Sequence, residues 1–509
     1  MKAAMGLFFS LFAMASFGGQ AVVFQADFNQ PGALDAWQGA GGRMVEGHQG
    51  TPSLLIEAAE AADRVVRWIE LPAQRLAGQF IALSAVVKAE AVSKPPRGWN
   101  GIKAMLTFET EHGEQHPQAQ LPDGAFDWTP ASLTTRAPKG LIKATLTLGL
   151  EQVSGKAWFD NVEIRVGLPD SGGQRNETLF KGHDLPRLRG VMHGPRFAEE
   201  NFRDLAQWGV NQVRWQLHWT AGPKAVDSAD LDAYEGWLDS ALEECDKAID
   251  ACQRYGIVAL VDLHSSPGGR NADGQHRIFT GARCQDKFIE VWERIARRYK
   301  GREAIYAYDL VNEPIERSVA PGLLSWRDLA AKAARAIRAV DPGKPIVFEP
   351  GPGGMCKGFD TLKPLDLDRV IYSFHMYLPQ AFTHQGVKGR EWGAVYPGII
   401  DGQMWDKEQL QETMAPALEF QRRYNVQIYV GEFSAVRWAP DHSAWRYLSD
   451  VIDLFEERGW DWSYHSFREW DGWSVEHGSD PKDHSPSPTP TDRQELLLRW
   501  FAKNQKPKR

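Results

Sequence analysis

The sequence predicts an α/β protein in which an all-β sandwich precedes a (β/α)8 barrel. Its 509 residues are enough for two or three domains. Between about residues 22 and 166, apolar and polar residues alternate with the period of half-buried strands. Between about residues 185 and 505, short apolar segments alternate instead with amphipathic helical segments. Eight such apolar segments favour a closed parallel barrel over an open doubly wound sheet.

The first 21 residues, MKAAMGLFFSLFAMASFGGQA, contain one lysine, an apolar run and then small residues. This layout is typical of a secretory signal peptide, with Ala15 or Ala21 as candidate cleavage sites. The apolar run is shorter than the roughly 20 residues needed to span a bilayer. We therefore expect a secreted protein, extracellular or periplasmic, with no membrane attachment after cleavage.

The predicted sandwich follows, over residues 22–166. In IKATLTLGLEQ, one face carries Leu146, Leu148 and Leu150, and the other carries Thr145 and Thr147. The segments RVVRWIEL, FIALSAVVKAE and GIKAMLTFET alternate in the same way, and turns such as LPDG separate them. The polar, glycine-bearing residues 167–184 are the expected linker.

The barrel is predicted over residues 185–505. Its expected strands are LRGVMHG, NQVRWQLH, IVALVDLH, AIYAYDLVNEP, PIVFEPG, RVIYSFHMY, VQIYVGEFS and WDWSYHSF. The expected helices are EENFRDLAQWG, LDSALEECDKAIDACQRYG, FIEVWERIARRYKG, LAAKAARAIRAV, LQETMAPALEFQRRYN, WRYLSDVIDLFEERG and the closing RQELLLRWFAKN. Several helices end in Gly or Asn just before the next strand, as helix C-termini commonly do.

Composition excludes several classes of partner and cofactor. The net charge of −8 offers no basic surface for nucleic acid or an anionic membrane. Histidines are dispersed singly without a metal-binding motif, so no metal or other cofactor is expected. The four cysteines, at 245, 252, 284 and 356, form no CxxC pair. We expect buried free thiols, with a Cys284–Cys356 disulfide as the alternative. The protein is expected to be a monomer.

Polar residues gather where the predicted barrel strands end, which is where barrel enzymes place their chemistry. They are Arg214, Asp262, His264, Asn312, Glu313, His375, Tyr377, Glu432 and, after the last strand, Trp470. Two carboxylates facing each other across a barrel mouth suit cleavage of a glycosidic bond. One protonates the leaving oxygen while the other attacks the anomeric carbon. Arg214 and Tyr377 are placed to keep Glu432 ionised, and Asn312, His264 and His375 to hold sugar hydroxyls.

This set of motifs resembles glycoside hydrolase family 5, the cellulase family of clan A. The motifs are Arg214, His264, Asn312–Glu313–Pro314, His375-x-Tyr377, Gly431–Glu432–Phe433 and Trp470, in the family's order. The resemblance implies that Glu313 is the acid/base and Glu432 the nucleophile of a retaining mechanism without a metal. It also implies that Trp470 floors the subsite where the bond breaks.

The last predicted strand of the sandwich, GKAWFDNVEIRV, resembles that of jelly-roll carbohydrate-binding modules. In such modules an acid such as Asp160 helps to hold a structural calcium. The apolar residues Trp158, Phe159, Val162 and Ile164 are expected in the core. Candidates for a sugar-stacking surface are Trp37, Trp99 and Trp128. A sandwich with a purely structural role remains the alternative.

The expected activity is that of a secreted endo-β-1,4-glucanase acting on a polysaccharide. The loop DLHSSPGGRNADGQ also resembles one found in exo-β-1,3-glucanases, so that activity and β-mannanase remain alternatives. A non-catalytic glycan-binding protein is the alternative from another class. The loops after the sixth and eighth predicted strands carry Trp392, Tyr396, Trp473 and His477. These residues either line sugar subsites or pack the loops against the barrel.

Overall fold

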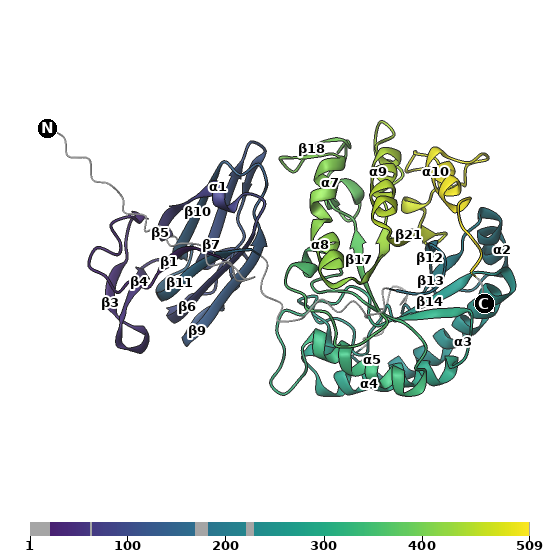
Figure 1. Cartoon of the computed structure of the whole chain (residues 1–509), viewed down its shortest axis with the longest axis horizontal. Coiled ribbons are helices and arrows are strands. Elements are labelled where there is room, and N and C mark those ends of the chain that lie inside the picture. The colour runs from purple at the N-terminus through teal and green to yellow at the C-terminus, as the bar shows by residue number, and fades with distance from the viewer. Residues whose placement is uncertain (1–20, 62–63, 168–181, 220–228, 508–509) are drawn as a thin grey trace. The chain divides into compact units, whose positions relative to one another are not determined.

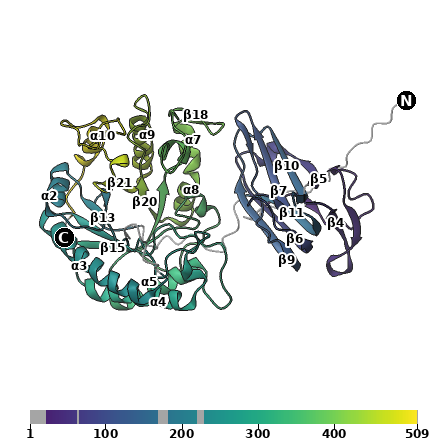
Figure 2. The same cartoon turned by 180° about the vertical axis from the view of Figure 1, so that it is seen from behind.

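The computed structural model describes residues 21–61, 64–167, 182–219 and 229–507. The chain divides into two compact units, residues 1–173 and 174–509 (Figures 1 and 2). All but the last residue of the predicted signal peptide lies outside the described residues, and so does most of the predicted linker. Among the described helices, none has the length and apolar character needed to cross a membrane.

The N-terminal unit consists of two antiparallel sheets. One has the order β3-β4-β11-β6-β9, with β1 paired to β11, and the other the order β2-β5-β10-β7-β8. The first sheet comprises β1 (Ala21–Ala26), β3 (Arg43–Glu46), β4 (Pro52–Ala58), β6 (Phe80–Val92), β9 (Gly124–Arg136) and β11 (Gly155–Val166). The second comprises β2 (Gln38–Gly39), β5 (Arg64–Leu71), β7 (Gly101–Thr110), β8 (Gly113–Gln115) and β10 (Lys143–Glu151). A short helix, α1 (Ala73–Leu76), follows β5.

The alternation seen in the sequence forms the core of the sandwich. Leu146, Leu148 and Leu150 on β10 are fully buried. On β11, Phe159, Val162 and Ile164 are buried as expected. Trp158 is only half-buried, because alternate residues of a strand point to opposite faces of the sheet.

One further expectation for the sandwich, that Trp37 belongs to a sugar-stacking surface, changes with the structure. Trp37, a candidate for sugar stacking, is buried against Phe24 and Phe28 and belongs to the core. The buried Asp160 accepts hydrogen bonds from the Ser53 hydroxyl at 2.8 Å and from its neighbour's backbone N–H at 2.7 Å. Each of its carboxylate oxygens therefore serves a contact within the sandwich.

The second unit is the predicted barrel, closed in the order β12-β13-β14-β15-β16-β17-β20-β21 with all neighbours parallel. The strands are β12 (Arg189–His193), β13 (Gln212–Gln216), β14 (Val258–Asp262), β15 (Ile305–Asp309), β16 (Ile346–Phe348), β17 (Val370–Met376), β20 (Gln427–Phe433) and β21 (Asp461–Phe467). Each of these strands lies within a segment predicted from the sequence.

Helices follow most of the strands and form the outside of the barrel (Figure 1). They are α2 (Glu199–Trp208), α3 (Leu231–Tyr255), α4 (Ala282–Tyr299), α5 (Trp326–Val340), α6 (Gln380–Thr383), α7 (Lys407–Thr413), α8 (Ala415–Tyr424), α9 (Ser443–Arg458) and α10 (Asp492–Phe501). The single helix predicted over LQETMAPALEFQRRYN divides at Met414, because Pro416 suits only the first turn of a new helix. A small hairpin of β18 (Gly398–Ile400) and β19 (Gln403–Trp405) precedes α7.

The barrel interior changes from apolar to charged along its axis. A cluster of buried side chains that includes Val258, Leu260, Ala307 and Ile371 fills one level. Farther along the strands, toward their carboxyl ends, the side chains become charged, beginning with the fully buried Arg214 on β13. The apolar layer supports the polar mouth in which the predicted site residues lie.

All four cysteines are free thiols. Cys245, Cys252 and Cys356 are buried, and Cys284 is half-buried, so the Cys284–Cys356 disulfide is not formed.

Candidate active site

A fully buried guanidinium, that of Arg214, organises the mouth of the barrel. Its contacts are Glu432 Oε1 at 2.7 Å, Asp309 Oδ2 at 2.9 Å, Glu349 Oε1 at 3.0 Å, Asn312 Oδ1 at 3.1 Å and Asp262 Oδ1 at 3.2 Å. One cation cannot balance four ionised acids in a dry interior. Burial, with the negative charges of Glu349 and Asp262, raises the pKa of Asp309 well above its usual range, although Arg214 opposes this. The neutral form of Asp309 is thereby favoured, and that form lowers the negative charge that Arg214 must offset.

Glu432, the predicted nucleophile, lies on β20 with its carboxylate almost completely buried. Oε1 accepts the hydrogen bond from Arg214, and Oε2 accepts one from the Tyr377 hydroxyl at 2.9 Å. His465 Nδ1 lies 3.0 Å from Oε2. Burial alone would favour the neutral acid, but the charges of His375, His465 and Arg214 hold the pKa of Glu432 well below its usual range. The carboxylate is thus kept ionised, as attack on an anomeric carbon requires.

Glu313, the predicted acid/base, follows β15 with a backbone φ of 49°. This left-handed conformation is unfavourable for a glutamate and is disfavoured further by the proline that follows. Two contacts hold it: the Glu313 N–H donates to Glu349 Oε2 at 2.9 Å, and Arg270 donates to the Glu313 carbonyl at 3.1 Å. Strain of this kind, costing on the order of 1–3 kcal/mol, persists where the surrounding structure imposes it and is common at functional sites. Here it accompanies a carboxylate that remains partly open to solvent, with 31% of its side chain exposed.

His375 on β17 connects the two candidate catalytic acids. Its Nδ1 lies 3.1 Å from Glu313 Oε1 and 3.7 Å from Glu432 Oε2, and its Nε2 lies 3.0 Å from Glu349 Oε1. Burial favours the neutral ring, but the charges of Glu349 and Glu432 raise the pKa of His375 well above its usual range. The nearest ligand atoms of Glu313, His375 and Glu432 all lie within 4.8 Å of one another.

These three side chains are close enough to hold a metal ion, yet their chemistry does not fit one. A metal-binding histidine must be neutral, whereas the charges of Glu349 and Glu432 raise the pKa of His375 and so favour its protonated form. Both oxygens of Glu432 already accept hydrogen bonds from positive or polar donors. The donors around Glu432 therefore suit an ionised carboxylate that can attack an electrophilic carbon.

A second series of hydrogen bonds runs from Asp262 through His264 to Asn312. Asp262 Oδ2 lies 2.8 Å from His264 Nδ1, and His264 Nε2 lies 3.2 Å from the Asn312 amide nitrogen. Because that amide nitrogen can only donate, His264 Nε2 accepts and Nδ1 carries the proton toward Asp262. Arg214 holds the Asn312 carbonyl oxygen, so both ends of the Asn312 side chain are fixed. Fixed amide and imidazole groups of this kind are suited to orienting sugar hydroxyls.

The structure brings eight of the nine residues expected at the strand ends into one network: Arg214, Asp262, His264, Asn312, Glu313, His375, Tyr377 and Glu432. Trp470 stands apart from it. Its ring, in a residue 37% exposed, packs edge-on against Trp473 and Trp438, with centroids 5.1 and 5.9 Å away. The ring that stacks on Tyr377 is that of Trp473, at 5.4 Å and 22°.

Aromatic rings continue from Trp470 away from the network. Trp438 packs against Trp392, which is 58% exposed. The series Trp473, Trp470, Trp438 and Trp392 thus leads from Tyr377 to an exposed surface. Tyr396, in the same loop as Trp392, is buried and donates to Asp450 at 2.7 Å, so it packs the loop instead.

Sequence analysis missed two members of the site. Glu349 follows the three-residue strand β16 and contacts Arg214, His375 and the Glu313 N–H. Its position directly after a strand was the available signal. His465 lies inside β21, between Glu432 and Glu469 Oε2, which is 3.3 Å from its Nε2. Burial favours the neutral ring, but these two acids raise the pKa of His465 to about 9.

Comparison with known proteins agrees with this geometry. The family model described as "Cellulase (glycosyl hydrolase family 5)" matches residues 174–470. Endoglucanase C of Acetivibrio thermocellus is 25% identical over 286 residues, covering 51% of this chain and 80% of that protein. Cellodextrinase A of Ruminococcus flavefaciens is 24% identical over 273 residues, covering 52% and 76%.

Among solved structures, the crystal structure of a glycoside hydrolase superposes with a TM-score of 0.51 at 24% identity. It covers 62% of this chain and 99% of that one, and it supports the fold alone. The family model spans more than half of the chain, and the residues it spans form the closed parallel barrel. The chain therefore belongs to the cellulase family, glycosyl hydrolase family 5, and is an endoglucanase-like glycoside hydrolase.

Proposed function

We propose that this enzyme cleaves β-1,4-glucosidic bonds within a β-glucan chain with retention of anomeric configuration. In this proposal Glu432 is the nucleophile and Glu313 the acid/base. The supporting observation is the separation of the two acids, whose nearest oxygens lie within 4.8 Å of each other. Retaining glycosidases hold their carboxyl groups about 5–5.5 Å apart, whereas inverting enzymes need about 6.5–9.5 Å to admit a water molecule.

The first step forms a covalent glycosyl-enzyme. Glu432 attacks the anomeric carbon while Glu313 gives its proton to the departing glycosidic oxygen, so the C–O bond breaks and an ester to Glu432 forms. Arg214 and His465 favour the ionised form of Glu432 before attack. Tyr377 donates to Oε2 and thereby fixes the orientation of the carboxylate.

The second step releases the sugar. Glu313, now a carboxylate, takes a proton from water, and the resulting hydroxide oxygen attacks the anomeric carbon and displaces Glu432. Two inversions at the same carbon give net retention. The exposure of Glu313, compared with the buried Glu432, suits a group that must meet water in this step.

The names of the relatives favour a β-1,4-glucan as substrate, since they include an endoglucanase and a cellodextrinase. The tryptophan series from Trp473 to Trp392 offers apolar faces on which successive sugar rings can lie. In this proposal Trp470 belongs to that platform. The signal-peptide-like residues 1–21 support export, which would bring the enzyme to a polymer that cannot enter the cell.

Product analysis tests this function on carboxymethylcellulose, barley β-glucan, laminarin and mannan, with the Glu432→Gln variant as the inactive control. We expect a rapid loss of viscosity and mixed oligosaccharides from the first two polymers, with none from the control. Proton NMR of the first product should show the β-anomer before mutarotation. Single glucose units released from laminarin, or cleavage of mannan alone, would move the specificity to the exo-β-1,3-glucanase or β-mannanase alternative. An α-anomer as first product would refute retention.

A further inference from the structure

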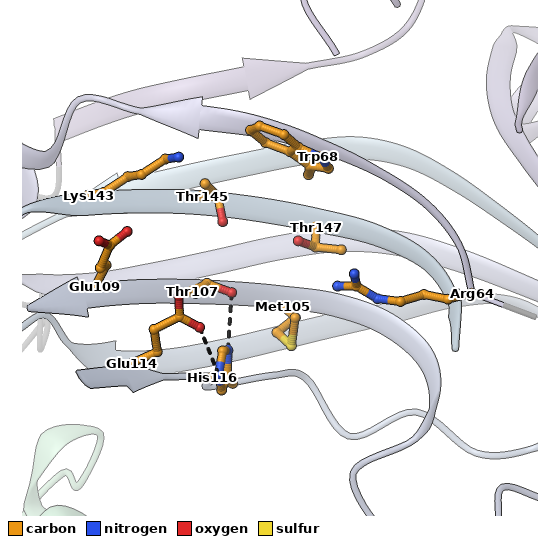
Figure 3. Close-up of a pocket in the computed structure, with 10 residues that line it drawn as sticks. All are labelled: Arg64, Trp68, Met105, Thr107, Glu109, Glu114, His116, Lys143, Thr145 and Thr147. Carbon is orange, nitrogen blue, oxygen red and sulfur yellow. Dashed lines mark hydrogen bonds and ion pairs between the residues drawn. The ribbon is translucent and has the colours of Figure 1, made fainter. Parts of the chain in front are cut away.

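The N-terminal unit has a groove of its own, on the outward face of the sheet β2-β5-β10-β7-β8. It has a volume of about 250 Å³ (Figure 3). The residues that line it are Arg64, Trp68, Met105, Thr107, Glu109, Glu114, His116, Lys143, Thr145 and Thr147. The three tryptophans proposed from the sequence for sugar stacking, Trp37, Trp99 and Trp128, are not among them.

The groove is hollow because short side chains of the central strand lie between longer ones. On β10, the leucines point into the core, so Thr145 and Thr147 point outward. Thr147 lies opposite Trp68 on β5 and Met105 on β7. Although they are on the outward face, Thr147 and Met105 are only 4% and 7% exposed. Thr147 and Met105 therefore form the floor of the groove, and Figure 3 shows Trp68 on one side of them and His116 on the other.

The charges of the groove cancel. Arg64 and Lys143 are matched by the carboxylates of Glu109 and Glu114. Lys143 lies opposite Glu109 across β10 and β7, and Glu109 lies opposite Glu114. An anionic ligand would meet the two acids of this groove, and a cationic ligand would meet Arg64 and Lys143. The charge pattern therefore favours a neutral ligand with many hydroxyl groups, which can donate to the carboxylates and accept from Arg64 and Lys143.

Trp68 supplies the apolar part of the site. It is half-buried, and Lys143 Nζ lies over its ring, 5.6 Å from the centroid, so a charged hydrogen-bond donor and an aromatic ring stand together in the groove. A sugar ring presents an apolar C–H face and a rim of hydroxyls. A flat aromatic face beside charged donors and acceptors matches both features at once.

We propose that this groove binds a single chain of a neutral polysaccharide. Its occupant is a β-1,4-linked glucan, so this identification rests on the function proposed for the barrel. Binding at a second site on one chain raises the effective concentration of polymer near the active site without changing the chemistry there. The benefit is therefore expected on polymers and not on short oligosaccharides.

Native electrophoresis of the full-length protein through gels containing barley β-glucan tests the groove. The Glu313→Gln background prevents digestion of the polymer in the gel. We expect Trp68→Ala to weaken retardation about tenfold, the scale of losing one aromatic anchor. Glu109→Gln should weaken it less and in the same direction. Trp128→Ala, which removes a half-buried tryptophan from the opposite sheet, is the matched control and should migrate like the parent.

Activity measurements separate this proposal from the one for the barrel. With Glu313 intact, Trp68→Ala should leave kcat/KM on cellotetraose unchanged and lower the rate on barley β-glucan. Equal retardation of the parent and both groove variants would overturn the groove as a binding site. So would a loss confined to Trp128→Ala, or a parent that is not retarded at all. Failure to cleave cellotetraose would count against the barrel's function and would leave the electrophoresis to decide the groove.

Discussion

The pairing of His465 with Glu432 leads to a prediction about the pH dependence of the enzyme. His465→Gln removes a positive charge whose Nδ1 lies 3.0 Å from Glu432 Oε2 and whose Nε2 lies 3.3 Å from Glu469 Oε2. Glutamine retains the ability to hydrogen-bond but cannot carry charge. The substitution therefore isolates the electrostatic contribution of the imidazolium.

The size of the effect follows from the pKa of His465. A rise from the usual 6.5 to about 9 corresponds to about 3 kcal/mol of preference for the charged ring. Two carboxylates share this interaction. If half of it belongs to Glu432, the charge of His465 lowers the pKa of that acid by about one unit, since 1.36 kcal/mol equals one unit. Removing it should raise the pKa of Glu432 by a similar amount.

The assay is kcat/KM on a soluble aryl cellobioside between pH 3 and 10, because this parameter reports ionisations of the free enzyme. We expect the acidic limb of the His465→Gln profile to move to higher pH by about one unit. The control is His384→Gln. Burial lowers the pKa of His384 to about 4, and its ring contacts Tyr377 and Trp473, so its loss should leave that limb in place. An acidic limb unchanged in His465→Gln, with only a lower plateau, would refute the electrostatic role.

Four further predictions follow from the candidate active site and its surroundings. Glu432→Ala should lower kcat about 10⁴-fold or more. Added azide should restore turnover with an α-glycosyl azide as product, and a near-normal rate in the folded variant would exclude Glu432 as nucleophile. Arg214→Met leaves buried carboxylates without their cation and should lower the free energy of unfolding by about 3–5 kcal/mol in a urea titration. The control Arg297→Met breaks an exposed pair with Glu293 and should cost at most about 1 kcal/mol; equal losses would mean that Arg214 has no special structural role. Trp470→Ala should lower kcat/KM about tenfold on cellohexaose and less on cellobiosides, and an equal loss on both would remove Trp470 from the proposed platform. The ion pair of Glu469 and His465 should stabilise the fold fully between pH 4.5 and 6.5. Its contribution is lost as pH falls toward about 2, the lowered pKa of Glu469, and as pH rises through about 9, the raised pKa of His465. Thermal melting across this range should flatten at both ends in Glu469→Gln, and an unchanged profile would contradict the pairing.

The barrel could be predicted because its strands are buried on both faces and end in polar residues. That pattern places chemistry at the carboxyl ends without any knowledge of three-dimensional contacts. It was sufficient to place Glu313 and Glu432, which lie beyond or next to the ends of their strands, whereas Arg214 is the middle residue of β13.

Three features of the site could not be predicted from the pattern of strands and strand ends. The strand before Glu349 has only three residues, and Glu-Pro-Gly resembles a turn. His465 lies within a strand whose two faces are both buried, so periodicity does not reveal which side chains enter the barrel. The order of Trp470 and Trp473 around the site depends on the path of an irregular loop, which no periodic pattern specifies.

The division of the site between strands and loops has an evolutionary consequence. The charges that hold the pKa of Glu432 low come from side chains on barrel strands, namely His375, His465 and Arg214. The tryptophans that extend toward solvent stand on the connections that follow β17, β20 and β21. Insertions or substitutions in those connections can alter which polymer is accepted while the charge network stays intact. Substrate specificity can therefore diverge through the loops while the strands preserve the catalytic chemistry.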